Sequence, residues 1–525
     1  MTLRVDAVIV GAGFAGIAQA LALRSAGVES FLIVERERRI GGTWRDNTYP
    51  GIACDVPSHL YSLASHPWPH WSRVFAPGGE IQAYLERIVA DEGLGAHLML
   101  GTALAGARWA DGAWRISLQH NAVSPGAYAP GNRVPGGSGP ESTALCLEEE
   151  EVVADHLVLA AGRLTEPRIP DIPGLGSFAG PLFHSARWDH DAAPHDDLAG
   201  RRIAVVGTGA TAIQLVPALA RRGARVTLFQ RTPAWIVPRE DHPVDVADRR
   251  LFAEDPSALA AHRARLYDEG EARFASRSGD EEAAAEMRQV ALDHLARQVP
   301  DPALRRALTP DYAFGCKRVL LSDDFYPAIA DGSVTLEPSA LAEVRGSSLV
   351  AASGARYEAD MIVLATGFVT TRQPYAPLVT GERGETLDEH WSGGMTAVAS
   401  TLVAGFPNLF VLNGPNASLG HNSSILLSEA QAEFAASLIA ERVSAPFAFG
   451  PVRVDDAAEE AATHDIAERA ARTPWLTGGC GNWYVDERSG RLTLLWPGTV
   501  ADFRARLDRV VPRRTQILHR EGVTP

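Results

Sequence analysis

The chain has few cysteines, a single lysine and no long apolar run, and each of these shortages excludes a class of protein. Four cysteines are present among 525 residues, and no two form a Cys-x-x-Cys pair: Cys54, Cys146, Cys316 and Cys480. Their scatter excludes a disulfide framework and any zinc site of the paired-cysteine type. It indicates a reduced protein of the cytoplasm, and no metal site is predicted.

Positive charge and membrane-length segments are also lacking. The formal net charge of −15 argues against nucleic acid or an anionic membrane as the main partner, because neither attracts a negative surface. No apolar run approaches the ~20 residues that a membrane-spanning helix needs. The hydrophobic fraction of 46% and the charged fraction of 22% are those of a globular protein, and the length allows two or three domains.

Lysine is almost absent, because 48 of the 49 Lys and Arg are arginines and the exception is Lys317. One retained lysine indicates a position that needs a compact ammonium rather than a planar guanidinium, unless it is an accident. Arg318 follows directly, and adjacent side chains on an extended segment point in opposite directions. One cation can then reach a nucleotide phosphate while the other enters an active site; the alternative is two solvated surface cations.

A glycine-rich motif near the N-terminus indicates a dinucleotide site. Its parts are a strand, a turn, a helix, a second strand and an acid, in this order: 5–10, Gly11-x-Gly13-x-x-Gly16, 14–25, 30–34 and Glu35. The glycines allow the backbone to approach a pyrophosphate at the helix N-terminus, and the acid accepts hydrogen bonds from a ribose. This unit is therefore predicted to bind a dinucleotide with a free 2′-hydroxyl, FAD.

The same pattern occurs a second time with a different ending. Its parts are 202–206, Gly207-x-Gly209-x-x-Ala212, 212–221, 225–229 and Gln230-Arg231-Thr232. Arginine and threonine in place of the acid suit a 2′-phosphate, so this unit is predicted to prefer NADPH over NADH. It closes with a strand at 361–364 and Ala365-Thr366-Gly367. We infer an internal duplication and an α/β fold with two Rossmann-type dinucleotide-binding domains.

The remaining segments surround these two units. Residues 103–165 are predicted to form short antiparallel strands, with a surface loop rich in Pro, Gly and Ser at 123–142. Residues 244–310 have helical spacing and are predicted to be a helical insertion that caps the substrate cleft. The irregular segment 41–58 is typical of loops that line a cofactor site. A helix at 423–439 is expected near the flavin, where its N-terminus stabilises negative charge.

The segment between the two glycine motifs reads Phe178-x-Gly180-x-x-x-His184-x-x-x-Trp188-Asp189. This spacing resembles the signature of the type I Baeyer–Villiger monooxygenases; the alternative is a Pro/Gly-rich linker whose His and Trp merely pack. The resemblance extends from about residue 5 to about residue 510. It departs from the family's pattern in the long loop at 123–142 and in Ala161, where Thr is commoner.

The resemblance implies an FAD- and NADPH-dependent enzyme that inserts one oxygen atom from O2 beside a ketone carbonyl, giving an ester or lactone via a C4a-peroxyflavin. It implies a small apolar ketone as substrate and no obligate protein partner. Arg318 is expected to be the fixed cation near the peroxide, and Asp55 to position it, unless Asp55 only caps a turn. The segment from Phe178 to Asp189 is expected to couple the two cofactor sites.

The predicted cofactor contacts and domain limits follow from these motifs. Those for FAD are Gly11, Gly13, Phe14, Ala15, Gly16, Glu35, Arg36, Gly42, Thr43, Trp44, Tyr49, Asp55, Asn413 and Gly414. Those for NADPH are Gly207, Thr208, Gly209, Ala210, Thr211, Ala212, Arg231, Thr232, Lys317, Ala365, Thr366 and Gly367. The predicted limits are 1–168 and 372–525 for the FAD domain, 169–190 for the linker, 191–239 and 315–371 for the NADPH domain, and 240–314 for the helical insertion.

Three other functions share part of this pattern. A disulfide reductase has the same two-nucleotide architecture but needs a cysteine pair near the flavin, which the sequence does not display. A heteroatom-oxidising flavin-containing monooxygenase uses a protonated hydroperoxide, has less need of Arg318, and generally lacks the Trp-Asp ending of the linker. A non-enzymatic NADPH/FAD redox sensor would not need Asp55 and Arg318.

Overall fold

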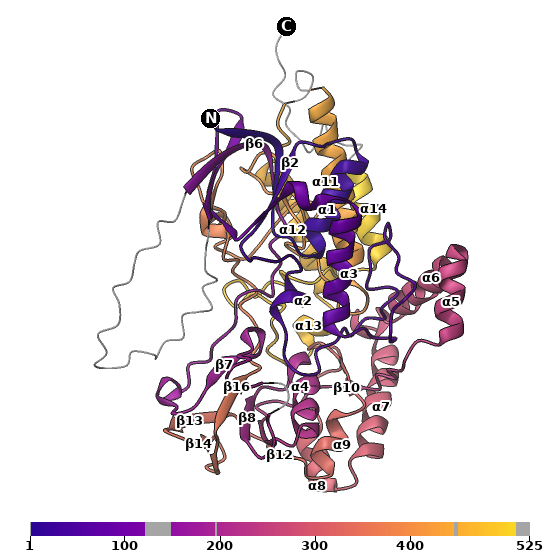
Figure 1. Ribbon diagram of the computed structural model, residues 1–525, viewed down its shortest axis with the longest axis vertical. Coiled ribbons are helices and arrows are strands. Elements are labelled where there is room, and N and C mark those ends of the chain that lie inside the picture. Colours follow the sequence, from indigo (N-terminus) through magenta and orange to yellow (C-terminus); the bar gives the residue numbers. More distant parts are fainter. Residues whose placement is uncertain (1, 121–148, 195–196, 446–449, 511–525) are drawn as a thin grey trace.

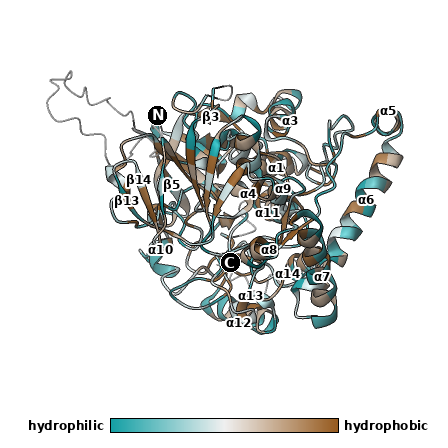
Figure 2. Ribbon diagram, turned by 90° about the horizontal axis from the view of Figure 1, so that it is seen from below, coloured by the Kyte–Doolittle hydropathy of each residue, from teal (hydrophilic) through white to brown (hydrophobic). Residues whose placement is uncertain are grey.

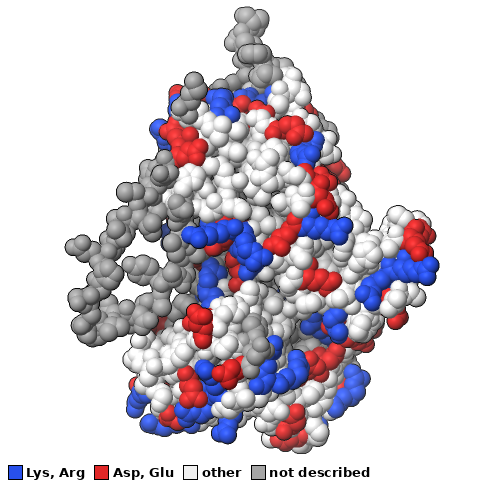
Figure 3. Space-filling model, viewed as in Figure 1, with Lys and Arg blue, Asp and Glu red and all other residues white. Residues whose placement is uncertain are grey.

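The computed structural model describes residues 2–120, 149–194, 197–445 and 450–510, and its strands form two main sheets. The first sheet lies in the upper part of Figure 1 and the second in the lower part. The predicted loop at 123–142 lies outside the described residues. On the face seen in Figure 3, acidic and basic side chains are interspersed.

The first sheet has the order β17-β4-β5-β6-β1-β2-β3, and β18 pairs with β6. Its strands are β1 (Leu3–Val10), β2 (Phe31–Glu35), β3 (Leu98–Leu100), β4 (Thr102–Ala110), β5 (Ala113–His120), β6 (Glu149–Leu159), β17 (Val379–Thr380) and β18 (Leu409–Val411). β1 pairs in parallel with β2 and β6, whereas β4, β5 and β6 pair antiparallel, which confirms the antiparallel strands predicted there. In β1, Ala7, Val8 and Ile9 are fully buried, as expected for a parallel strand covered on both faces.

Helices from both ends of the chain pack beside this sheet. They are α1 (Phe14–Ser25), α3 (Gly78–Asp91), α11 (Ser424–Ser444) and α14 (Val500–Val510). α1 packs against α11, and α11 against α14, so the C-terminal part of the chain returns to the first unit (Figure 1). Further helices belong to it: α2 (Thr43–Asp46), α10 (Leu387–His390), α12 (Asp456–Ala470) and α13 (Pro474–Thr477).

The second sheet is entirely parallel, with the order β12-β9-β8-β16-β7. Its strands are β7 (Leu182–His184), β8 (Arg202–Val206), β9 (Arg225–Phe229), β12 (Val334–Glu337) and β16 (Met361–Leu364). α4 (Ala210–Arg221) and α9 (Phe325–Ala330) pack on it. A small antiparallel sheet adjoins it: β13 (Leu341–Arg345), β14 (Ser348–Ala351) and β15 (Arg356–Glu358). Figure 2 shows brown, hydrophobic residues along several of the molecule's strands.

The predicted helical insertion is present between β10 (Ile236–Val237) and β11 (Leu320–Leu321), which pair in parallel. Its helices are α5 (Val246–Glu254), α6 (Pro256–Ala272), α7 (Glu281–Gln298) and α8 (Pro302–Leu308). α5 and α6 project from the body of the molecule (Figures 1 and 2). α6 and α7 begin at Asp255 and Asp280, whose carboxylates accept backbone N–H groups of the first turn, a stabilising N-cap.

The segment predicted as a linker contributes a strand to the second sheet. β7 pairs with β16 so that His184 lies beside Leu364. Just before it, the chain runs next to the other connection between the two units: the amide of Arg168 donates to Gly367 O, and the amide of Val369 donates to Glu166 O. The two crossings are therefore held together by backbone hydrogen bonds.

The structure corrects the expectation of reduced cysteines. Cys316 and Cys480 form a disulfide, whereas Cys54 is free and buried. The two bonded residues are 164 positions apart, so their spacing gave no sign of pairing. Within the described ranges, no helix is long and apolar enough to cross a membrane, and no group of three or more His, Cys, Asp or Glu could hold a metal ion.

Candidate functional site

The two glycine turns have the same geometry. Gly11 and Gly207 have φ of 107° and 114°, a region that favours glycine. A Cβ on Gly11 would lie 2.6 Å from Ala160 O, and one on Gly207 would lie 2.4 Å from Ala365 O. α1 and α4 then begin without a side-chain cap and without an acid in the first turn. Their first N–H groups are therefore available to phosphate groups, so both turns fit a dinucleotide.

Glu35 lies at the carboxyl end of β2, as the ribose-binding interpretation requires. Its buried carboxylate accepts the amides of Ala12 at 2.9 Å and Glu37 at 3.0 Å and pairs with Arg45 Nη1 at 2.9 Å. A carboxylate has about four acceptor positions, so one remains for a ribose hydroxyl. Arg36, the next predicted contact, donates to Glu166 at 3.0 Å.

The second unit has a different arrangement at the end of β9. Gln230 is buried, and its side-chain Nε2 donates to Ala307 O at 2.7 Å. Arg231 is exposed, and Thr208 Oγ1 donates to Thr232 O at 2.7 Å. Lys317 has its ammonium 4.9 Å from the centre of the Tyr312 ring. Burial and the nearby Arg231 charge lower the pKa of Lys317, which shows that the two cations lie close enough to repel.

Arg318 points away from this pair of cations and contacts Asp55. Its Nε and Nη2 donate to Asp55 Oδ2 at 2.9 and 2.8 Å. The side chains are 29% and 27% exposed, so the ion pair lines an accessible space rather than lying in the core. The neighbouring carboxylate raises the pKa of Arg318 still further, which keeps its charge fixed at any working pH. The structure thus brings together two residues separated by 263 positions.

Three side chains beside this ion pair are neutral. Burial raises the pKa of Tyr484 to about 12, and it raises the pKa of the Tyr61 and Cys54 side chains. The Tyr61 ring packs edge-on against Phe14 and Trp44, and Trp44 Nε1 donates to Tyr61 Oη at 3.3 Å. Two further cations, Arg239 and Arg277, lie close to the pair, so positive charge prevails there.

Tyr49, one of the predicted FAD contacts, links the loop at 41–58 to the second unit. Its ring packs in the core of the second unit, and its hydroxyl donates to Gln214 of α4 at 3.0 Å. Gln214 donates in return to Ala53 O at 2.9 Å. The loop that carries Asp55 is thus fixed to the helix that begins at the second glycine turn.

Two signature residues between the units, His184 and Trp188, are buried, whereas Asp189 is exposed. His184 is 4% exposed; its Nδ1 accepts the amide of Ala186 at 3.1 Å, and its Nε2 has no partner among the described residues. Burial lowers the pKa of His184 to about 4, so the ring is neutral. Trp188 Nε1 donates to Ala193 O at 3.1 Å, and Asp189 accepts two backbone amides. Phe178 is partly buried, and a Cβ on Gly180 would lie 2.3 Å from Asp360 O.

The turn after β18 adds a group that the sequence did not reveal. Asn413 accepts a hydrogen bond from Arg163, which also donates to Ala417 O at 3.2 Å. Arg163 is 6% exposed, and burial lowers its pKa to about 10. The adjacent Gly414 leaves no room for a side chain, since a Cβ would lie 2.5 Å from Val411. Arg163 follows β6 directly and so ties the carboxyl ends of β6 and β18 together.

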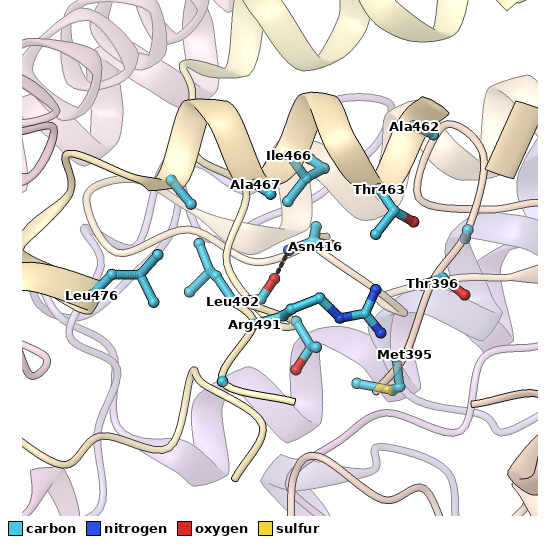
Figure 4. Close-up of a pocket in the computed structure, with 14 residues that line it drawn as sticks. Met395, Thr396, Asn416, Ala462, Thr463, Ile466, Ala467, Leu476, Arg491 and Leu492 are labelled. Atoms are coloured by element: carbon cyan, nitrogen blue, oxygen red, sulfur yellow. Dashed lines mark hydrogen bonds between the residues drawn. The ribbon is translucent and has the colours of Figure 1, made fainter. Parts of the chain in front are cut away.

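A pocket elsewhere contains none of the predicted site residues. Figure 4 shows it beneath α12, with Arg491, Asn416 and Leu492 among its lining residues. Asn416 Nδ2 donates to Leu492 O at 2.8 Å, and Arg491 donates to Gly394 O at 3.0 Å. Because these polar groups serve the backbone, the pocket offers no arrangement suited to redox chemistry.

Comparison with known proteins agrees with the two-nucleotide architecture. A family model described as pyridine nucleotide-disulphide oxidoreductase matches residues 5–254. A protein of Streptomyces coelicolor named Baeyer–Villiger monooxygenase is 42% identical over 514 residues, which is 97% of this chain and 92% of the relative. This relationship outweighs the disulfide-reductase alternative, although Cys316 and Cys480 supply in space the cysteine pair that the sequence did not display.

Solved structures extend the likeness to the whole fold. OTEMO in complex with FAD and NADP is 25% identical with a TM-score of 0.82, and the alignment covers 99% of this chain and 100% of that chain. Cyclohexanone monooxygenase from Rhodococcus sp. Phi1 bound to NADP+ gives the same identity and TM-score, with 100% of both chains covered.

Proposed function

We propose residue roles from one premise: the chain belongs to the Baeyer–Villiger monooxygenase family and is an FAD- and NADP-dependent enzyme that inserts one oxygen atom from O2 beside a ketone carbonyl. The observation that carries these roles is the contact of two Arg318 nitrogens with one oxygen of Asp55. It fixes a permanent cation at an accessible position.

The two glycine turns are proposed to hold the cofactors. FAD would lie on Gly11–Gly16 with its ribose at Glu35, and NADPH on Gly207–Ala212 with its 2′-phosphate at Arg231 and Lys317. When bound, the two cofactors supply the hydride and the activated oxygen. All later steps depend on how this chain orients the substrate and stabilises charge.

Arg318 is proposed to stabilise the negative charge that develops during oxygen insertion. A guanidinium cannot lose its proton at working pH, and it acts most strongly where water is excluded. Asp55 is proposed as a positioning residue, because it accepts hydrogen bonds from Nε and Nη2 of Arg318. Nη1 of Arg318 is then left to face the reacting atoms. No side chain is required as a covalent nucleophile.

The chain from Phe178 to Asp189 is proposed to couple the two nucleotide units. It supplies β7 to the second sheet and adjoins both crossings between the units, so a shift of one unit must move His184 or Trp188. The helices α5 to α8 are proposed to cap the substrate cleft, and the domain limits predicted from the sequence are retained as proposals.

We propose a small, mainly apolar ketone as the substrate and no obligate protein partner. Support comes from the neutral aromatic side chains of Tyr484 and Tyr61, which are buried beside Arg318. We propose the cytoplasm as the place of action. In that reducing compartment the Cys316–Cys480 bond would be open to reduction.

The function is tested by product identification. The purified holoenzyme is given NADPH, O2 and a panel of cyclic, aromatic and steroidal ketones. Esters or lactones formed in proportion to NADPH consumed are the expected result. If every ketone yields only hydrogen peroxide, with no ester from any of them, the proposed function is wrong.

A further inference from the structure

A second buried guanidinium lies near the ion pair, and no carboxylate balances it. Arg277 ends a short 3-10 turn (Ala275–Arg277) between α6 and α7 and is 7% exposed. Among the residues that the structure describes, no Asp or Glu pairs with it. A buried charge without a counter-ion costs free energy, so it is expected where a ligand or another polar group compensates it.

The stem of Arg277 runs between the chain segments that build the active site. A Cβ on Gly315, three residues before Arg318, would lie 3.5 Å from Arg277 Cγ. A Cβ on Gly420, which precedes α11, would lie 3.8 Å from Arg277 Cδ and 3.7 Å from Trp475. Arg277 therefore lies where the helical insertion, the Arg318 segment and the C-terminal part of the first unit meet.

One edge of the guanidinium is occupied and the other is available. Nη1 donates to Arg273 O at 2.9 Å and to Ser276 Oγ at 3.0 Å, which fixes the orientation of the group. Nε and Nη2 have no partner within the described ranges. These two nitrogens form the edge that grips a carboxylate through two parallel hydrogen bonds.

The other groups near Arg277 add no negative charge. Asp55 is already bonded to Arg318, and the Tyr484 phenol is neutral because burial raises its pKa to about 12. His421 contacts Glu271 at 3.3 Å, and burial lowers the pKa of the imidazole. Burial, with the positive charges of Arg273 and Arg318, lowers the pKa of Arg277 to about 10, so it remains protonated at neutral pH.

We propose that Arg277 binds the substrate and that the preferred ketone carries a carboxylate, which pairs with Nε and Nη2 while the carbonyl faces Arg318. This inference rests on the proposed function and names its substrate class. A nucleotide phosphate is the less fitting occupant, because Arg231 and Lys317 already form a cation pair for the 2′-phosphate on the other side of the Lys317–Arg318 segment.

The test compares keto acids with their methyl esters. The two members of a pair share one ring and one ketone group. Across the panel the carboxylate lies at increasing distances from the ketone. In the best pair, the wild-type kcat/KM should be roughly tenfold or more higher for the acid than for its methyl ester at low salt. This ratio should be smaller at high salt. Arg277→Met, which keeps the apolar stem, should remove the preference, and Arg277→Lys should retain part of it.

Arg273→Met is the matched control, because it removes a nearby cation of the same insertion whose side chain is exposed at the surface. It should leave the acid-to-ester ratio within about twofold of wild type. The affinity for a saturated carboxylic acid that has no ketone group is measured by calorimetry. In Arg277→Met this affinity should fall by the same factor as the kcat/KM preference for the acid.

Three results would overturn the inference. They are an acid-to-ester ratio near one in every pair, a ratio unchanged in Arg277→Met, and an Arg277→Met variant whose only defect is a raised KM for NADPH. In each case ester formation from the neutral substrates would leave the proposed function intact. If neither acids nor esters are converted by wild-type enzyme, the proposed function itself is wrong.

Discussion

The two nucleotide-binding units share a backbone and differ at one strand end. In both, a glycine at positive φ approaches the carbonyl that follows the closing strand, Ala160 in the first unit and Ala365 in the second. At the end of the second strand, however, Glu35 gathers two amides and Arg45, whereas buried Gln230 leaves the exposed end to Arg231. We propose from this comparison that the backbone binds the pyrophosphate in both units and that side chains select the nucleotide.

The same division recurs at two adjacent residues. Lys317 lies against Tyr312 and near Arg231, in the second unit. Arg318 turns the other way and contacts Asp55, from the loop of the first unit. We propose that this one dipeptide serves both units, with Lys317 in nucleotide selection and Arg318 in oxygen chemistry.

The largest expected effect comes from separating Arg318 and Asp55. Arg318→Ala and Asp55→Ala should each lower ester formation by roughly 100-fold or more, since loss of one donor to a developing negative charge costs that much. Because the two residues act as a unit, the double variant should be little worse than Arg318→Ala. A double-mutant cycle in kcat/KM checks this, and fully additive losses would show that Asp55 does not act through Arg318.

Nucleotide preference should be the next largest effect. Charge-assisted hydrogen bonds contribute roughly 1.5–3 kcal/mol each, so NADPH should exceed NADH by about tenfold or more in kcat/KM. Lys317→Ala should reduce that margin. Arg221→Ala, which removes an exposed arginine paired with Asp324, is the control and should not. Equal use of NADPH and NADH by wild-type enzyme would contradict the assignment of the second unit.

Changes between the units should have a smaller effect. His184→Ala or Trp188→Ala should slow turnover while FAD stays bound. Both residues pack within or beside the second sheet, and neither belongs to the predicted FAD turn at Gly11–Gly16. Flavin content by absorbance and stopped-flow reduction by NADPH separate the two properties. Loss of flavin from His184→Ala would instead assign the residue a structural role.

The smallest effect concerns the Cys316–Cys480 bond. Thiol titration of the denatured protein should find two fewer thiols without a reductant than with one. Cys480→Ser should lower thermal stability while changing kcat/KM by no more than about twofold, because a cross-link acts mainly on the unfolded chain. Equal thiol counts with and without reductant would show that the two cysteines are not bonded in the isolated protein.

Three strands of the second unit could be predicted residue for residue. The runs at 202–206, 225–229 and 361–364 are mainly apolar, and they coincide with β8, β9 and β16. Such runs depend on local sequence and on burial between two helical layers. The role of 178–189 as part of a sheet was not predicted, because a three-residue strand such as β7 is defined by its partner.

The site was predicted less completely, for the same physical reason. The resemblance named Arg318 and Asp55, but among 48 arginines nothing local marks Arg277 or Arg163 as buried. Their burial depends on segments that meet only in the folded chain, as does the disulfide. The hydrogen bond from Tyr49 to Gln214 was likewise not predicted, because Gln214 lies on a helix of the other unit.

The central claim is that Arg318 carries the oxygen chemistry, and the fate of NADPH in Arg318→Ala tests it most directly. The measurement is ester formed per NADPH consumed, with a ketone and a sulfide assayed side by side and hydrogen peroxide determined in both. The variant should keep its flavin, oxidise NADPH and release hydrogen peroxide with no ester from the ketone. Ester formation by Arg318→Ala at near wild-type yield would contradict the claim.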